Sequence, residues 1–198
     1  MNHIYPVFDR IVPRELKEEK LNQHSIVVWF TGLSGSGKTT LAIALEEELF
    51  ERGFLTQILD GDNIRMGINN NLGFSPDDRT ENIRRIAEVS KLFLHCGIIT
   101  LCAFVSPTQE IRHMVRNIVG RESFFEIYVN TPLKVCEQRD VKGLYAKARA
   151  GEIKDFTGIN APFEYPRDAD FSIDTSSLSL DKCIEMLLNK LVPIIQKS

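Results

Sequence analysis

A glycine-rich turn near the start of the chain has the composition of a phosphate-binding loop. Residues 32–40 read Gly-Leu-Ser-Gly-Ser-Gly-Lys-Thr-Thr, which contains the complete pattern Gly-x-x-x-x-Gly-Lys-Thr. The glycines let consecutive backbone N–H groups turn toward one anion, and a helix that begins behind them adds its positive dipole end. Lys38 is expected to reach the β- and γ-phosphates of ATP, and the Thr39 hydroxyl to ligate Mg²⁺. The predicted ATP ligands in this loop are Gly32, Leu33, Ser34, Gly35, Ser36, Gly37, Lys38, Thr39 and Thr40.

Two carboxylates, Asp60 and Asp62, follow the second apolar run of the chain. A motor or switch NTPase normally carries its aspartate after a later strand, but here that strand ends in Ser106. Carboxylates near a phosphate loop suit a kinase, which has to activate a hydroxyl and exclude water. In an extended segment Asp60 and Asp62 would share one side. One would then serve as the base and the other would hold Mg²⁺, and the sequence does not apportion the two roles.

Ser106 has two interpretations. The segment Ser-Pro-Thr-Gln at 106–109 resembles a helix start, with Ser106 as the N-cap. Ser106 also ends a central strand, where ligands of open α/β sheets bind. A covalent phosphoserine would need an activating base, and none is evident nearby in the sequence. We therefore predict direct phosphoryl transfer, with Ser106 at the site in a role left open.

The elements that would position these residues alternate along the chain. The predicted strands are 25–31, 54–59, 98–105, 124–130 and 171–174. The predicted helices are 15–21, 39–52, one that runs from a cap at Asp78 or Thr80 to about His95, one that follows Ser106, and 179–196. Because no hairpin signal joins the strands, they predict right-handed βαβ units. The expected architecture is a three-layer α/β/α P-loop kinase fold with a parallel central sheet.

Two segments do not fit this alternation. Residues 139–168 are basic, contain glycine and end near two prolines, which favours a mobile lid over the site. Residues 1–24 are expected to form an N-terminal arm whose function is not readable from the sequence. The predicted organisation is therefore an arm at 1–24 and one kinase domain at 25–198, with its lid at about 139–168.

Several further blocks are far more restrictive than the phosphate loop alone. They are LDGDNIR at 59–65, LGFSPDDRTENIRR at 72–85, FVSP at 104–107, CEQRDVKGLYAKAR at 136–149 and FTGI at 156–159. With these blocks the chain resembles the adenylylsulfate kinase (APS kinase) family from about residue 25 to residue 175. The resemblance implies transfer of the γ-phosphoryl of ATP to the 3′-hydroxyl of adenosine 5′-phosphosulfate, which gives PAPS and ADP. It also implies Mg²⁺ as cofactor and a homodimer.

The resemblance also implies the site residues. The implied catalytic residues are Lys38, Asp62 and Ser106. The implied metal ligands are Thr39, Asp60 and Asp62, and Arg139 is an additional implied ligand of ATP. The implied ligands of the acceptor substrate are Asp62, Arg65, Phe74, Arg79, Asn82, Val105, Ser106, Lys142, Gly143, Leu144 and Phe163. Without the resemblance, the arginines and lysines would be ordinary surface charges and the phenylalanines ordinary core residues. With it, Phe74 and Phe163 are expected to sandwich the adenine of the acceptor.

Composition limits the alternatives. The net charge of −3 argues against a general nucleic-acid binder, and no apolar run predicts a membrane span or a secretion signal. The four cysteines show no metal-binding spacing and are interpreted as reduced cytoplasmic thiols packed in or near the core. A nucleoside or sugar kinase of the same fold and a nucleotide-binding regulatory protein remain as alternatives. The blocks at 59–65 and 156–159 disfavour the first, and the retained catalytic set disfavours the second.

Overall fold

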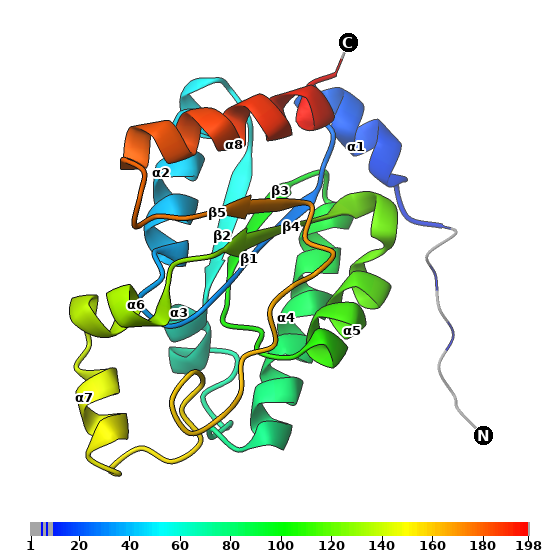
Figure 1. Ribbon diagram of the computed structural model, residues 1–198. Coiled ribbons are helices and arrows are strands. Elements are labelled where there is room, and N and C mark those ends of the chain that lie inside the picture. The colour runs from blue at the N-terminus through cyan, green and yellow to red at the C-terminus, as the bar shows by residue number, and fades with distance from the viewer. Residues whose placement is uncertain (1–4, 6, 8–9, 198) are drawn as a thin grey trace.

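A single parallel sheet forms the centre of the molecule. The computed structural model describes residues 5, 7 and 10–197 (Figure 1). The five-stranded sheet has the order β2-β3-β1-β4-β5, and every pairing is parallel. Its strands are β1 (Val27–Thr31), β2 (Thr56–Asp60), β3 (Ile99–Ala103), β4 (Phe124–Val129) and β5 (Phe171–Ile173). All the predicted strands are confirmed, with ends that differ by one to two residues at most positions.

Helices cover both faces of this sheet. They are α1 (Arg14–Leu21), α2 (Lys38–Glu51), α3 (Gly61–Met66), α4 (Pro76–His95), α5 (Gln109–Val119), α6 (Leu133–Arg139), α7 (Leu144–Arg149) and α8 (Leu180–Ile195), with a 3-10 turn at Arg121–Ser123. Helices α2 and α8 pack on one face and α4 and α5 on the other (Figure 1). Because β1 lies at the centre, all five of its residues are buried. The predicted α/β/α layers are confirmed.

Two helix starts were predicted wrongly. Helix α4 is capped by Ser75, whose Oγ accepts the Asp78 N–H, and neither Asp78 nor Thr80 is the cap. Pro76 occupies the first helical position, where its missing N–H costs nothing. Helix α5 is capped by Thr108, not Ser106. Ser106 has a left-handed φ of 45°, so the chain still turns there and the helix begins later.

Three short helices, α3, α6 and α7, were missed, because helices of this length have little stability of their own and form through tertiary contacts. Helix α7 lies within the segment that we predicted to be a lid. Tyr145, Ala148 and Phe156 pack with Leu33 of the phosphate loop in a third apolar cluster. Residues 139–168 therefore lie against the loop that holds the predicted ATP site.

The N-terminal helix lies at the far end of the molecule from α7 (Figure 1). Arg14 donates to Ser25 and Ser123, and the Gln23 side chain donates to two backbone carbonyls of the body, Leu55 and Gly97. The predicted helix at 15–21 is thus confirmed. Residues 1–4, 6 and 8–9 of the predicted arm lie outside the described residues.

The cysteines are free, and Cys102, Cys136 and Cys183 are buried as predicted. Cys96 is the exception, because it follows α4 at the surface and is exposed. Within the described part of the chain, no helix combines the length and the apolar character that crossing a bilayer would need.

Candidate active site

The phosphate loop connects the carboxyl end of β1 to the first turn of α2. Gly37 precedes the helix with a φ of 101°, and a Cβ added there would meet Thr175 at 3.3 Å. Gly32 is even more restricted, because a Cβ would stand 2.7 Å from the carbonyl oxygen of Val129. Only glycine fits these two positions. The loop predicted from the sequence is therefore present between the expected strand and helix.

Lys38 folds back over this loop. Its Nζ donates to the carbonyl oxygen of Leu33 at 2.7 Å, and only 8% of the residue is exposed. Burial lowers the pKa of Lys38 to about 8, against the opposing effects of Cys136 and Asp60. The ammonium group thus lies inside the loop. The negative charge of a bound phosphate would favour the charged form of this lysine and offset the effect of its burial.

Side chains that follow β4 and β5 also hydrogen-bond to the loop. The carbonyl oxygen of Ser36 accepts hydrogen bonds from Thr131 at 2.9 Å and from Thr175 at 2.8 Å. Arg139 joins them, since it donates to Thr175 at 2.8 Å and to the carbonyl of Gly35 at 3.3 Å. Arg139 therefore lies at the predicted ATP site.

The sequence analysis missed Thr131 and Thr175. A usable signal existed, because Thr131 and Thr175 each stand two residues beyond the end of their strand, β4 and β5. The carboxyl ends of parallel strands meet at one edge of the sheet, so polar residues at that offset are candidates for the site.

The two aspartates lie at this edge but in different elements. Asp60 ends β2, where its Oδ2 accepts the Thr39 hydroxyl at 2.7 Å. Asp62 lies in the first turn of α3 and is exposed. The expected extended segment is absent here, because Asp60 caps α3 by accepting the Asp62 N–H. The prediction that they share one side of an extended strand was wrong.

Lys142, which lies in the segment 139–168, contacts Asp62, since its Nζ donates to Asp62 Oδ2. The residues that follow it, Gly143 and Leu144, begin α7, with Gly143 in a left-handed conformation at φ 65°. Residues predicted as ligands from two distant segments are therefore in direct contact.

Arg65, Phe74 and Arg79 form a second group of predicted ligands. The Arg65 guanidinium lies 4.4 Å from the centroid of the Phe74 ring, and that of Arg79 lies 5.9 Å from it. Phe74 is 63% exposed, so it is not a core residue. Arg79 also donates to the carbonyl of Asp155 at 2.9 Å, which ties α4 to the lid segment. An exposed aromatic face beside two cations suits a base with an anionic tail.

Asn82 lies behind this group on α4 and is buried. Its Oδ1 accepts from Asn69 Nδ2 at 3.0 Å, and Arg85 donates to Asn69 Oδ1 at 3.4 Å. Asn69 was missed, because nothing in an Asn-rich loop distinguishes one amide from its neighbours.

Ser106 and Val105 follow β3 directly beside the loop. The N–H of Gly32 donates to the carbonyl of Val105 at 3.4 Å, and Ser106 is only 1% exposed. The Ser106 Oγ accepts a hydrogen bond from the indole of Trp29 at 2.9 Å. Ser106 therefore lies directly beside the phosphate loop, and its role at the site stays a prediction.

Phe163 belongs to a different set of contacts from Phe74. It stacks on Tyr128 with centroids 6.1 Å apart and meets Tyr165 edge-on at 5.9 Å. The next residue, Glu164, contacts the start of α5, since its Oε2 accepts the Gln109 N–H at 2.7 Å. Phe163 is only partly buried and is held near the Ser106 turn.

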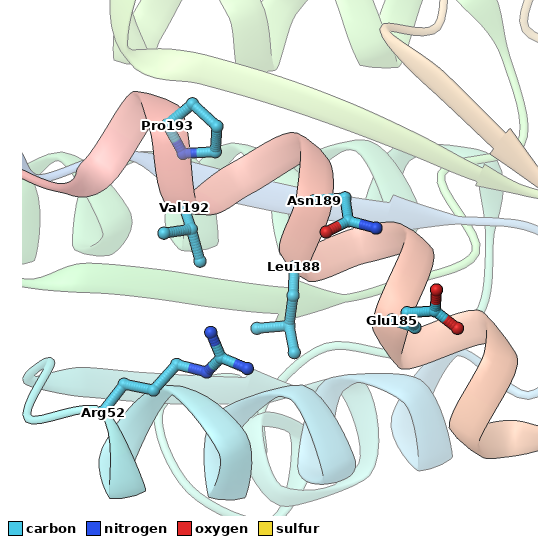
Figure 2. A pocket seen from close by; sticks show the side chains of 6 residues that line it. All are labelled: Arg52, Glu185, Leu188, Asn189, Val192 and Pro193. Carbon is cyan, nitrogen blue, oxygen red and sulfur yellow. The ribbon is translucent and has the colours of Figure 1, made fainter.

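A surface hollow of about 230 Å³ lies elsewhere, between α2 and α8 (Figure 2). Arg52 lines it and follows the last turn of the 14-residue α2, so it is about 20 Å from the phosphate loop. The chemistry-bearing residues gather instead at the carboxyl edge of the sheet. A phosphate loop, nearby carboxylates and a basic segment beside them on this fold define a P-loop phosphotransferase.

Comparisons with known proteins narrow this class. The model of the family described as adenylylsulphate kinase matches residues 24–174. The adenylyl-sulfate kinase of Bacteroides thetaiotaomicron is 65% identical over 99% of this chain and 98% of its own length. The structure of the Mycobacterium tuberculosis APS kinase CysC in complex with AMPPNP and APS superposes with a TM-score of 0.80 at 44% identity, over 84% of this chain and 96% of that one. The hexameric APS kinase from Thiobacillus denitrificans gives a TM-score of 0.65 at 31% identity, over 86% of this chain and 29% of that one.

The chain belongs to the adenylylsulfate kinase family. Its activity is that of an adenylyl-sulfate kinase, a phosphotransferase that uses ATP and makes PAPS. The alternatives that the sequence left open, a nucleoside or sugar kinase and a regulatory protein, are thereby excluded.

Proposed function

We propose that the reaction takes place at the carboxyl edge of the sheet, with ATP on the phosphate loop and adenosine 5′-phosphosulfate between α4 and the lid segment. The observation that carries this proposal is the convergence of Lys38, Asp62 and Lys142 from three separate elements onto one edge. Lys38 binds the β- and γ-phosphates, and its charge stabilises the transferring group in the transition state. The proposed ATP ligands are residues 32–40 together with Arg139.

The acceptor substrate is held by residues of α3 and α4, of the loop between them and of the lid segment. Arg65, Arg79 and Lys142 bind the phosphosulfate oxyanions, for which guanidinium and ammonium groups are suited. Phe74 and Phe163 contact the adenine, although they belong to separate contact groups in the ligand-free chain. The remaining proposed ligands are Asn82, Val105, Ser106, Gly143 and Leu144.

The 3′-hydroxyl of the acceptor is a weak nucleophile near neutral pH and needs a group that takes its proton. Asp62 is exposed at the edge of the sheet and pairs with the exposed side chain of Lys142, so it is available for that role. Transfer is direct, and Ser106 binds substrate without forming a covalent bond. No aspartate, glutamate or histidine of the described residues hydrogen-bonds the Ser106 hydroxyl, which a nucleophilic serine would need.

The donor set at the loop fits Mg²⁺. The Thr39 hydroxyl and the Asp60 carboxylate are in contact, with Asp62 in the next turn, and magnesium prefers such oxygen ligands. Among the described residues no cluster of three or more acidic, histidine or cysteine side chains could cage a metal. This matches an ion held by few protein groups together with substrate phosphates. When bound, Mg²⁺ would neutralise charge on the β- and γ-phosphate oxygens.

We also propose the organisation that the sequence suggested: an arm at 1–24, a kinase domain at 25–198 with its lid at about 139–168, a homodimer and a cytoplasmic location. One relative is described as hexameric, which supports self-association of some kind. Free buried thiols support a reducing compartment. No nucleic acid or membrane partner is proposed, given the net charge of −3.

The test is coupled ADP release with a panel of acceptors: adenosine 5′-phosphosulfate, 5′-AMP, a nucleoside and gluconate. We expect ADP release only with the phosphosulfate, and PAPS as the product by mass spectrometry. Lys38→Ala is the matched blank, because it keeps the glycine loop and removes only the charge aimed at the phosphates. Comparable turnover of this variant would place the chemistry elsewhere in the molecule.

A further inference from the structure

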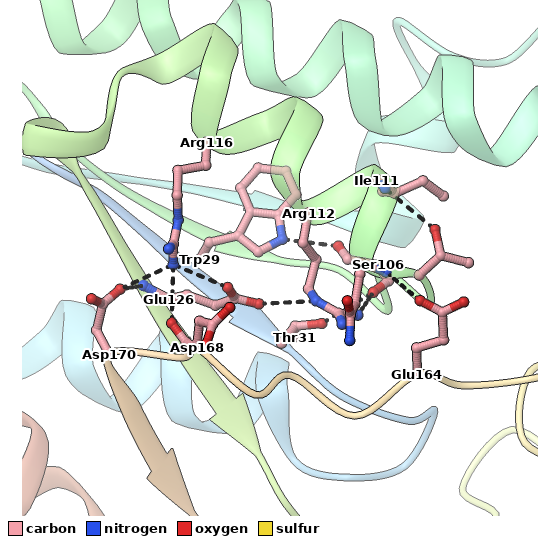
Figure 3. A network of polar contacts seen from close by, with 12 residues as sticks. Trp29, Thr31, Ser106, Ile111, Arg112, Arg116, Glu126, Glu164, Asp168 and Asp170 are labelled. Atoms are coloured by element: carbon pink, nitrogen blue, oxygen red, sulfur yellow. Dashed lines mark hydrogen bonds and ion pairs between the residues drawn. The ribbon is translucent and has the colours of Figure 1, made fainter.

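The Ser106 hydroxyl has a hydrogen-bond partner that lies 77 positions away in the sequence and inside the sheet (Figure 3). Trp29 is the middle residue of β1 and is fully buried. Its ring stacks on Phe104 with centroids 5.3 Å apart and packs against Phe124 at 6.2 Å. The indole N–H therefore has a fixed direction, and it points at Ser106 Oγ at 2.9 Å.

An indole N–H can only donate. Ser106 Oγ must therefore be the acceptor in this bond, and one of its lone pairs is engaged. The hydrogen of the hydroxyl is left for another acceptor, and the described residues place no acceptor within hydrogen-bond reach of it. An oxygen of the bound substrate is the natural partner for that hydrogen.

The backbone of the Ser106 turn is held just as firmly. Arg112 Nη1 donates to the Ser106 carbonyl at 2.9 Å (Figure 3). Thr31 Oγ1 donates to the Val105 carbonyl at 2.9 Å. Arg112 is itself buried and pairs with buried Glu126 at 3.3 Å. These contacts hold Ser106 in the left-handed conformation, at φ 45°, that serine seldom adopts.

We propose that Trp29 is a positioning residue of the kinase reaction, which fixes the Ser106 hydroxyl as a hydrogen-bond donor toward an oxygen of the bound substrates. The inference rests on the proposed place of Ser106 at the site. It adds a residue that touches no substrate and acts only through Ser106. With its lone pair engaged by the indole, Ser106 Oγ is a poorer nucleophile, in agreement with direct transfer.

The first test is a double-mutant cycle between Trp29→Phe and Ser106→Ala. Trp29→Phe keeps an aromatic ring against Phe104 and removes the N–H. We expect it to lower kcat/KM for the acceptor by about tenfold, of the order of one lost hydrogen bond, with the Kd for ATP unchanged. In the Ser106→Ala background the same change should cost less than about twofold, because the group on which Trp29 acts is gone.

The second test needs no change at Trp29, which is the single tryptophan of the chain. The protein labelled with ¹⁵N-tryptophan should show one indole N–H resonance, and Ser106→Ala should move it upfield as the hydrogen bond is lost. Thr100→Val is the matched control. Thr100 lies in the same sheet, and its buried hydroxyl has no hydrogen-bond partner among the described residues. That control should leave both the resonance and the kinetics close to wild type.

The outcomes separate the two claims. Trp29→Phe could lower kcat/KM equally in the wild type and in the Ser106→Ala variant, or the indole resonance could stay in place in Ser106→Ala. Either result would overturn the role of Trp29 and leave Ser106 at the site. A Ser106→Ala enzyme with wild-type kinetics would overturn both.

Discussion

Burial of Lys38 disfavours the charged form of its side chain in the nucleotide-free protein. Its ammonium group is enclosed by the loop and donates to a backbone carbonyl, so its pKa is lowered to about 8 by burial. ATP brings the negative charge that the site lacks and therefore binds the protonated lysine more tightly than the neutral one. Nucleotide binding and protonation of Lys38 are consequently linked.

This linkage predicts a pH dependence of ATP binding. Below pH 8 the lysine is already charged, and the Kd for ATP should be level. Above pH 8 binding must take up a proton, so the Kd should rise by up to about tenfold for each pH unit. Calorimetry in two buffers of different ionisation enthalpy measures the proton uptake directly. Lys38→Arg stays charged and should take up none, and proton uptake equal to that of the wild type would refute the linkage.

Asp62 should be the carboxylate that matters most for the rate. Asp62→Asn is expected to cut kcat by roughly 10²–10⁴-fold if the residue is the base, with ATP binding retained. If it acts chiefly as a metal ligand, high Mg²⁺ should restore part of the rate. Initial rates over a magnesium series distinguish the two roles. Lys142→Met is the companion variant, because it removes the partner of Asp62 but leaves the carboxylate. A normal rate with normal magnesium dependence in Asp62→Asn would exclude both roles.

At the scale of elements, a polar chain holds the turn between α3 and α4. Glu81 accepts from Arg85, Arg85 donates to Asn69, and Asn69 donates to Asn82. An arginine can only donate, so it sets the orientation of the Asn69 amide, which in turn sets that of Asn82. This orientation points the Asn82 amide oxygen at Asn69, and the amide nitrogen is the atom that we propose donates to the acceptor substrate. The turn is thereby placed beside the group formed by Arg65, Phe74 and Arg79.

Asn69→Ala should therefore weaken acceptor binding and spare ATP. We expect the KM for the acceptor to rise roughly tenfold, and the free energy of unfolding to fall by about 1–3 kcal/mol because the buried Asn82 Oδ1 loses its partner. Asn71→Ala is the matched control, since Asn71 is exposed and contacts only Arg85 in the same network. Steady-state kinetics with each substrate varied provide the measurement. A parallel rise in the KM for ATP would mean that the variant disturbs the whole site.

At the scale of the whole molecule, α1 fastens the amino-terminal edge of the sheet, opposite the site. Glu18 is buried and accepts hydrogen bonds from the backbone and hydroxyl of Ser25 and from Arg14. Burial would raise the pKa of Glu18, but these hydrogen bonds outweigh it and hold the pKa below its ordinary value. A carboxyl group with a lowered folded pKa stabilises the protein above its unfolded pKa, and this contribution is lost as the pH falls through the folded pKa.

Glu18→Gln should consequently destabilise the protein at pH 7 by about 1–3 kcal/mol and make its stability less sensitive to acid below about pH 4.5. Denaturant unfolding at several pH values measures both effects. The kcat of the folded variant should match the wild type, because α1 lies far from the phosphate loop (Figure 1). Unchanged stability at pH 7 would show that the Glu18 contacts contribute nothing net.

The amino-acid sequence alone determined the class of fold, the phosphate loop and most of the candidate site. Each of these is encoded locally: a buried strand is a continuous apolar run, and a phosphate loop needs its glycines and lysine within one short stretch. The arginines, aspartates and lid lysine could be named because they lie in blocks typical of one family. The strands β1 to β5 were found for the same local reason.

Only the tertiary structure decided which of these residues touch. The hydrogen bonds that assemble the site join residues far apart in the sequence. They link Trp29 to Ser106, Thr131 and Thr175 to the phosphate loop, and Lys142 to Asp62. Such pairs leave no periodic signal, since each depends on where separate strands end in space. The misassigned cap of α5 has the same origin, because Ser106 could have capped this helix by its type but is held by Trp29 and Arg112 instead. The short helices α3, α6 and α7 also form only against the body of the protein, since helices of their length are unstable alone.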